Sequence, residues 1–221
     1  MSNESRSMKR QLDKAELFLK NIQQEDLLYS LKAHGYEEPS LEKGEVLYAK
    51  VLQLMEEKRN LKIAYSDAKS QFLKASKEAR KFFIDALVSA RRYSREEWIH
   101  QELKLKGRAP RNFLGWTEKA EDLYKALINN KKMLDNYKNS MLVKDNLEHG
   151  LQMLENLKPL HAAAENTKGK SQQATINQKK AFHELRKWYR KVTGICRMAF
   201  SEDPKQLVRL GIKPLFPPRV S

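Results

Sequence analysis

The stretch LEKGEVLYAKVLQLMEEKRNLKIAYSDAKSQFLKASKEARKFFIDALVSARR, residues 41–92, decides the fold. Its apolar residues recur every three or four positions, with small residues in the middle: Leu47, Val51, Leu54, Leu61, Tyr65, Ala68, Phe72, Ala75, Ala79, Phe82 and Ala86. This spacing puts one apolar stripe along an α-helix, and the small residues let a neighbouring helix approach closely. The stretch has no proline and only Gly44 near its start. It therefore predicts one long helix from about Leu41 to Arg92 that packs against other helices.

Downstream, a second apolar series of the same kind begins at Phe113 and slips by three residues at Lys144. Because proline removes a backbone hydrogen bond of a helix, the series predicts a second helix of about 50 residues that kinks or ends at about Lys158, just before Pro159. The polar stretch 165–175 predicts a flexible connector. A third strong helix is then expected from about Ile176 to Phe200.

Shorter patterns complete the chain. We expect a first helix over residues 12–31 with a bend near Gln24, and short helices over Arg95–Lys104 and Pro204–Leu210. No stretch alternates apolar and polar residues in the manner of a strand, which excludes a sheet. The sequence thus predicts an all-α fold, one elongated antiparallel helical bundle spanning residues 1–221 with two long spine helices.

A weak internal repeat is present. Arg80-Lys81-Phe82-Phe83, with Ala90-Arg91 further on, is similar to Arg186-Lys187-Trp188-Tyr189, with Cys196-Arg197 at the same distance. A Leu–Gly–Pro pattern also recurs, at Leu31–Gly35–Pro39, Leu103–Gly107–Pro110 and Leu207–Gly211–Pro214. Glycine after a helix that ends on leucine is typical of a left-handed C-cap. The repeat indicates either a duplicated helical hairpin or only the glycine and proline residues that end helices in any helical protein.

The charge balance is strongly basic. The 221 residues include 43 Lys and Arg against 28 Asp and Glu, a net charge of +15, with 40% hydrophobic residues. The apolar fraction excludes global disorder, and only 8 Gly and 7 Pro exclude a collagen-like chain. Such a charge predicts attraction to nucleic acid, an anionic membrane surface or an acidic protein, unless it only solvates the surface.

The last long helix concentrates this charge on one face. On a helical wheel, one stripe carries the candidate polyanion-binding residues, which are Lys179, His183, Arg186, Lys187, Arg190 and Arg197. The opposite side is apolar, with Ala181, Leu185, Trp188, Val192, Ile195, Cys196 and Ala199. The stripe could follow a nucleic-acid backbone, meet an acidic protein or simply face solvent. Its apolar side is expected to be buried in the bundle, which argues against membrane insertion.

One resemblance involves the C-terminal region. Residues 188–212 follow the pattern W-Y-x-x-V-x-x-I-C-R-M-A-F-x-E-x-P-x-x-L-x-x-L-G-I. This pattern resembles the C-terminal signature of a family of uncharacterised bacterial all-helical bundle proteins. The resemblance implies a helical bundle, and it implies no activity, cofactor or catalytic residue.

The sequence contains only incomplete motifs for metal binding, nucleophilic catalysis and phosphate binding. Glu97 and His100 form the one Glu-x-x-His spacing, whereas a di-iron bundle needs two. Cys196, the single cysteine, falls on the apolar face and excludes an intramolecular disulfide. Gly169-Lys170-Ser171 lacks the earlier glycine of a phosphate-binding loop. We therefore expect no catalytic residue, cofactor or metal, and a cytoplasmic location, because neither a signal peptide nor a membrane-spanning segment is evident.

These observations lead to two functional hypotheses. The first is a non-enzymatic structural or interaction protein that presents helical faces to an unknown protein partner or to a second copy of itself. The alternative is a sequence-nonspecific nucleic-acid-binding protein that uses the basic stripe of the last long helix.

Overall fold

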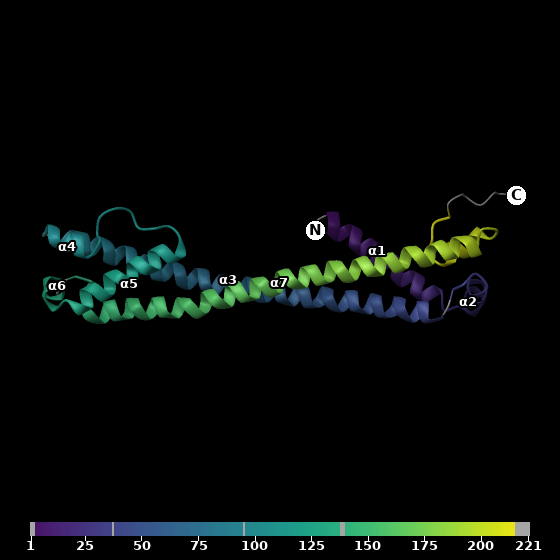
Figure 1. The fold of residues 1–221 in the computed structure, drawn as a ribbon, viewed down its shortest axis with the longest axis horizontal. Helices are drawn as coiled ribbons and strands as arrows, with labels where there is room; N and C mark the ends of the chain where they lie inside the picture. The colour runs from purple at the N-terminus through teal and green to yellow at the C-terminus, as the bar shows by residue number, and fades with distance from the viewer. Residues whose placement is uncertain (1–2, 37, 95, 138–139, 215–221) are drawn as a thin grey trace. The chain divides into compact units, whose positions relative to one another are not determined.

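A computed structural model describes residues 3–36, 38–94, 96–137 and 140–214 of the chain. It contains the following helices (Figure 1): α1 Asn3–Asn21, α2 Glu25–Lys32, α3 Glu38–Tyr93, α4 Glu97–Glu102, α5 Phe113–Asn129, α6 Lys131–Asn136, α7 Lys144–Ala199 and α8 Pro204–Arg209. There is no strand in this described part. The structure therefore confirms the prediction of an all-α helical bundle with two long helices, which are α3 and α7.

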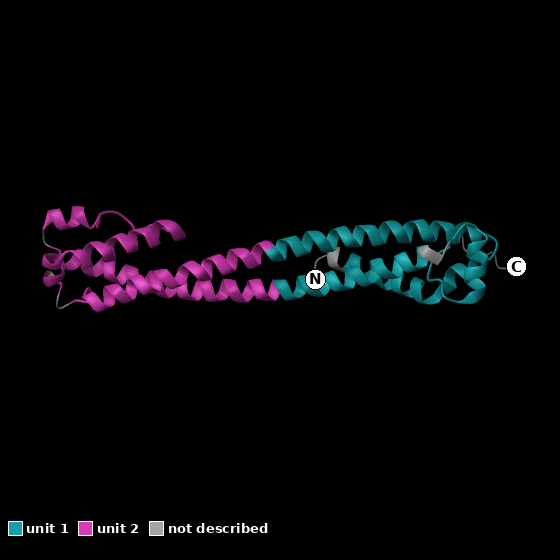
Figure 2. Cartoon of the chain, turned by 60° about the horizontal axis from the view of Figure 1, so that its bottom comes forward, with its two compact units in different colours: residues 1–61, 170–221 teal, residues 62–169 magenta. Residues whose placement is uncertain are grey.

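The residues group into two compact units (Figure 2). Unit 1 comprises residues 1–61 and 170–221, and unit 2 comprises residues 62–169. The prediction from the sequence is a single domain with no boundary inside it. Each of the long helices α3 and α7 contributes one part to unit 1 and the other part to unit 2, and each unit has a hydrophobic core of its own.

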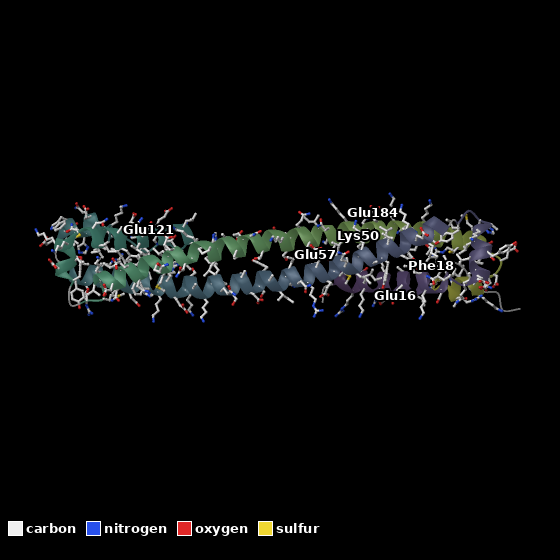
Figure 3. The ribbon with its side chains drawn as sticks, turned by 90° about the horizontal axis from the view of Figure 1, so that it is seen from below. Glu16, Phe18, Lys50, Glu57, Glu121 and Glu184 are labelled. Carbon is white, nitrogen blue, oxygen red and sulfur yellow. The ribbon has the colours of Figure 1, made fainter. Side chains whose placement is uncertain are left out.

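The core of unit 1 is built around aromatic residues of α1 and α7. Phe18, labelled in Figure 3, is fully buried and packs edge-on against Trp188 with ring centroids 5.9 Å apart. The Trp188 indole nitrogen donates a hydrogen bond of 2.8 Å to the backbone carbonyl of Ser40 in α3. Gly44, one turn further along α3, lies directly against the indole ring. The ring is thereby fixed between α1 and α3 in contact with both.

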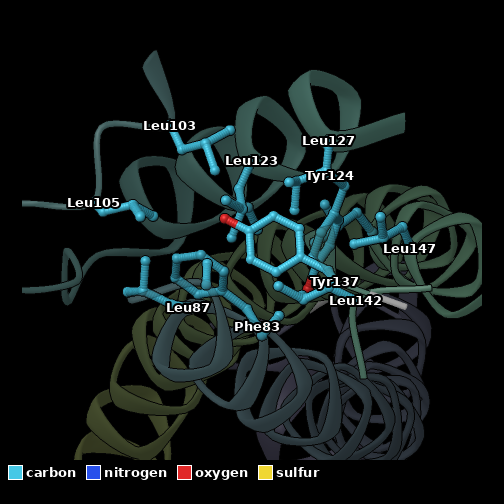
Figure 4. Packing of buried hydrophobic residues seen from close by; sticks show 14 of the residues in the cluster. Phe83, Leu87, Leu103, Leu105, Leu123, Tyr124, Leu127, Tyr137, Leu142 and Leu147 are labelled. Carbon is cyan, nitrogen blue, oxygen red and sulfur yellow. The ribbon is translucent and has the colours of Figure 1, made fainter. Parts of the chain in front are cut away.

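The core of unit 2 has the same character (Figure 4). Phe83 of α3 is fully buried and stacks on Trp116 of α5, with ring centroids 6.3 Å apart. Leucines from α3, α5, α7 and the segment after α4 belong to the same cluster of buried residues. The Tyr137 hydroxyl, also buried, is hydrogen-bonded to the hydroxyl of Ser94, so this polar group has a partner inside the core.

The two halves of the chain repeat one order of helices. Helices α3 and α7 each have 56 residues, and each position of α3 has its counterpart 106 residues later in α7. Two helices precede each long helix, and a six-residue helix follows it. The counterparts Gly44 and Gly150 both lie against aromatic rings, of Trp188 in unit 1 and of Phe82 and Tyr124 in unit 2. This correspondence supports a duplicated helical unit, and not merely the recurrence of glycine and proline at helix ends.

Two of the three predicted glycine caps are confirmed. Gly35 and Gly211 have φ angles of +81° and +72°, in the left-handed region that glycine adopts without a steric penalty. In each case the N–H of the following residue bonds back to a helix carbonyl, of Leu31 at 3.0 Å or of Leu207 at 2.8 Å. This is the pattern of a Schellman cap.

The third glycine does not end its helix. Helix α4 ends through Lys104, a non-glycine residue with φ of +48°, and the N–H of Leu105 bonds to the carbonyl of His100 at 2.9 Å. Gly107 has φ of +82°, but it lies beyond this cap in the loop. The prediction that Gly107 caps the helix is wrong, because Lys104 has already taken the left-handed position.

The predicted helix from Phe113 to Pro159 is also wrong. Helix α5 ends at Asn129, and α6 begins at Lys131. Asn130 between them has an extended backbone, and its side chain accepts a hydrogen bond of 3.1 Å from the N–H of Met133. Asparagine is a preferred N-cap, so it starts a new helix there. The slip in register at Lys144 marks the first residue of α7.

Helix α7 runs through Pro159 without ending. Proline removes the hydrogen bond to the carbonyl four residues earlier, which is that of Glu155. Both residues lie at exposed positions, where water can hydrate that carbonyl in place of the missing N–H. Of the two predicted outcomes at Pro159, a kink or an end of the helix, the end is therefore wrong.

The predicted flexible connector at 165–175 is helical as well. Its threonines bond within their own helix, from the Thr167 hydroxyl to the carbonyl of Ala163 at 2.8 Å and from the Thr175 hydroxyl to that of Ser171 at 3.0 Å. A polar composition in this stretch reflects a solvated helix surface, and it does not indicate a loop.

Gly44 and Gly169 should respond oppositely to the same substitution. A Cβ on Gly44 would lie 2.1 Å from the Trp188 ring, whereas one on Gly169 would meet nothing within 4 Å. We expect Gly44→Ala to lower the free energy of unfolding by about 1–3 kcal/mol through overpacking. Gly169→Ala should raise it by about 0.5–1 kcal/mol, because alanine favours the helix. Urea denaturation of both variants measures this, and equal effects would contradict the packing described at Gly44.

Candidate anion-binding site

The last part of α7 presents the predicted amphipathic surface. Its apolar positions are buried in the core of unit 1, with Ala181, Leu185, Trp188, Val192 and Cys196 almost inaccessible to solvent. Ile195 and Ala199 are half-buried at the margin. The spacing of these residues fixes the rotation of the helix, and the opposite stripe consequently faces outward.

The six predicted polyanion-binding residues occupy that outward stripe. Five of them are exposed, and Arg197, nearest the C-terminal end of α7, is half-buried; the exposed residues are Lys179, His183, Arg186, Lys187 and Arg190. Glu184, labelled at the surface in Figure 3, is the only carboxylate in the sequence between Ile176 and Phe200. The stripe is therefore strongly positive.

Three of the six residues come together in a pocket between α1 and α7, and we call it the basic pocket. It has a volume of about 270 Å³ and is lined by Arg186, Arg190 and Arg197 of α7 and by Gln11 and Lys14 of α1. Positions four and eleven residues apart lie within about 40° of one another on an α-helix, which brings the three arginines to one flank. The other predicted residues, Lys179, His183 and Lys187, do not line this pocket.

No carboxylate lines the basic pocket. Two acidic residues of α1, Asp13 and Glu16, act instead on Tyr48 of α3. Burial, a hydrogen bond with Glu16 and the charges of Glu16 and Asp13 raise the pKa of this tyrosine to about 12. None of the four cationic side chains of the pocket forms an ion pair with a residue that the structure describes. Their charges are left to solvent or to a ligand.

Two buried polar atoms at the pocket have no hydrogen-bond partner among the described residues. They are the Nε of Arg197 and the Oε1 of Gln11. A buried donor or acceptor without a partner costs about 1–3 kcal/mol, so such groups are normally satisfied by protein, water or ligand. Both residues line the pocket, and the two unpaired atoms are themselves shielded from solvent.

The α1 side of the pocket could not be found from the sequence. Lys14 and Gln11 flank buried residues of α1, and nothing in the local pattern tells which helix they meet. Tyr189 also lines the pocket, and it packs edge-on against Phe18 at 5.7 Å.

A larger hollow in unit 2 has a different electrostatic character. Its volume is about 540 Å³, and it is lined by residues of α4, α5 and the loop between them. Carboxylates of Glu118 and Asp122 lie among its lysines, and Asp122 pairs with Lys104 at 3.1 Å. Because the charges are partly neutralised within the hollow, it is the weaker candidate for binding an anion.

The remaining candidates for catalysis or metal binding are the single cysteine and the histidine and carboxylate side chains. Cys196 is fully buried, and burial raises the pKa of its thiol to about 12, so it stays protonated near neutral pH. Among the described residues, no three histidine, cysteine or carboxylate side chains are grouped in a way that could hold a metal ion. In the same residues, no helix has the length and hydropathy to cross a membrane.

Comparisons with known proteins add no further assignment. Protein-family models, curated proteins and solved structures were compared with the chain, and none of them matches it. The resemblance of residues 188–212 to a family of bacterial helical proteins stays a prediction. A function for this chain must therefore be inferred from the residues of the site.

Proposed function

We propose that the chain is a non-enzymatic interaction protein that binds an anionic macromolecule through the basic stripe of α7. The supporting observation is that the two sides of one helix have different roles. From Ile176 on, the apolar side of α7 packs in the core of unit 1, while the rest of its surface carries exposed cationic residues and a single carboxylate, Glu184. A helix fixed by its own core presents these charges without paying for the ordering of a loop.

A nucleic acid is the second, more specific candidate for the partner. Arginine, which binds phosphate through two parallel hydrogen bonds, occupies positions 186, 190 and 197 on one flank. A stripe of this kind contacts the sugar–phosphate backbone and does not distinguish bases. An acidic protein would use the same charges, and the experiment below separates the two partners.

Binding to nucleic acid should depend steeply on salt. We expect the affinity for a labelled mixed-sequence 20-mer to fall linearly with salt on a logarithmic plot, by a slope of about 0.7–0.9 for each phosphate contacted. Arg186→Glu with Arg190→Glu should weaken binding at least tenfold and reduce the slope by about two. Fluorescence anisotropy between about 50 and 200 mM NaCl measures both quantities for single-stranded and duplex probes.

The matched control is Lys74→Glu with Lys77→Glu. These two lysines are exposed on α3 within unit 2, and their reversal changes the net charge by the same amount. Unchanged affinity in the arginine variant, or an equal loss in the control, would contradict a site on α7. A labelled polyglutamate peptide that binds where both nucleic acids fail would identify an acidic protein as the class of partner.

A further inference from the structure

The duplication supplies a counterpart for the basic pocket in unit 2. Since α3 and α7 correspond position by position at a distance of 106 residues, the counterpart of Arg186 is Arg80, and that of Arg197 is Arg91. The same residue type is present at both pairs of positions. What the arginines do in one unit can therefore be compared with what they do in the other.

In unit 2, the two arginines hold a segment of the chain. Arg80 donates to the carbonyls of Pro110 at 3.1 Å and Arg111 at 2.9 Å. Arg91 donates from its Nε to the carbonyl of Leu105 at 2.8 Å, and from a terminal nitrogen to that of Gly107. The loop between α4 and α5 thus supplies acceptors for both guanidinium groups.

The lysine of the pocket has a counterpart as well. Buried positions of α1 and of the residue after it recur 105 residues later in α5, which pairs Ala15, Phe18, Leu19 and Ile22 with Ala120, Leu123, Tyr124 and Leu127. On this alignment Lys14 corresponds to Lys119. The Lys119 amine lies 3.5 Å from the carbonyl of Lys106, in the same loop. The three counterpart cations in unit 2, Arg80, Arg91 and Lys119, therefore all lie next to backbone carbonyls.

In unit 1, the same three cations have no such acceptors among the described residues, and a fourth cation is added. Arg190 stands where unit 2 has Ile84. The Nε of Arg197 is buried without a partner, whereas that of its counterpart Arg91 is bonded. Four cationic side chains line this pocket and no carboxylate does, so the pocket carries a net positive charge, with water hydrating the three cations that are exposed. The occupant that fits is an anion.

We infer that the basic pocket binds the phosphate group of a small phosphomonoester. Guanidinium groups match phosphate oxygens in pairs, and phosphate accepts several hydrogen bonds at once. Gln11 lines the same pocket, and its side-chain amide can donate or accept a hydrogen bond, which suits a hydroxyl group on the rest of the ligand. A volume of about 270 Å³ suits a small ligand. The inference uses arginines of the proposed function, but it does not require a macromolecular partner.

Titration calorimetry tests the inference with three probes, which are inorganic phosphate, glycerol 3-phosphate and glycerol. Sodium chloride keeps the ionic strength equal in every titration. We expect both phosphates to bind, glycerol 3-phosphate more tightly, and glycerol not at all. Arg186→Gln and Arg190→Ile, the latter restoring the residue of unit 2, should each weaken binding about 10- to 100-fold, as expected for a lost charge-assisted hydrogen bond.

Lys187→Gln is the matched control, because it removes the same charge from the neighbouring residue outside the pocket. It should leave the affinity for glycerol 3-phosphate unchanged and weaken only the macromolecular binding proposed above. Circular dichroism of each variant confirms that the fold is kept. Absence of heat with both phosphates, or an equal loss in Lys187→Gln, overturns the phosphate site. If the unmodified protein binds glycerol 3-phosphate but no polyanion, the proposed function is overturned and the phosphate site is not.

Discussion

Replacing Trp188 with alanine is expected to lower the free energy of unfolding by about 3–5 kcal/mol. The indole is only 6% exposed, packs edge-on against Phe18 and donates a hydrogen bond to the carbonyl of Ser40. Gly44 leaves no side chain beneath the ring that could fill the resulting cavity. For a chain of this length, the melting temperature should fall by at least roughly 6 °C.

Trp98→Ala provides the comparison. This tryptophan is 44% exposed on the short helix α4, so its removal should change the free energy of unfolding by less than about 1 kcal/mol. Trp188→Phe separates two contributions, because it keeps an aromatic ring and loses the bond to Ser40. Urea unfolding monitored by circular dichroism measures all three variants. Similar costs for Trp188→Ala and Trp98→Ala would refute the core described for unit 1.

Phe83→Ala should have an effect of similar size in the other unit, about 3–5 kcal/mol. Phe83 is completely buried and stacks on Trp116 at the centre of the unit 2 core. Leu73→Ala, at a position of α3 that is 53% exposed, should cost less than about 1 kcal/mol.

Hydrogen exchange can locate the two losses. Amides of unit 2 should lose protection in Phe83→Ala, and amides of unit 1 in Trp188→Ala, because each residue belongs to a separate core. If either variant loosened both units equally, the division of the core into two clusters would have no energetic meaning.

The helices were predictable wherever an apolar stripe dictates them. Every position of the stripe from Leu47 to Ala86 is buried or half-buried, and α3 begins and ends within a few residues of the predicted limits. The predicted helix limits were wrong where one local interaction outweighs the periodicity of the apolar residues. The cap at Asn130 divides a stripe that continues on both sides, and Pro159 is tolerated at an exposed position.

The candidate site was predictable only on one helix. The three arginines of the pocket follow from the helical wheel of α7, since their rotation is set by the buried residues opposite. The contributions of Lys14 and Gln11 depend on which flank of α1 meets α7, and no local pattern encodes this tertiary pairing. Likewise, the similarity of Arg80 and Arg186 was visible in the sequence. That carbonyls of Pro110 and Arg111 engage Arg80 required the structure.

The division of unit 1 into two stretches of chain has a consequence during synthesis. Unit 2 is continuous, whereas residues 1–61 must wait for residues 170–221 before their core can close. At about 5–20 residues per second, translation of the intervening unit lasts roughly 5–20 s. For that interval the nascent chain displays the apolar faces of α1 and α2, including Phe18 and Leu27, without their partner helix. Unit 2 is therefore complete, and able to fold, before unit 1 is.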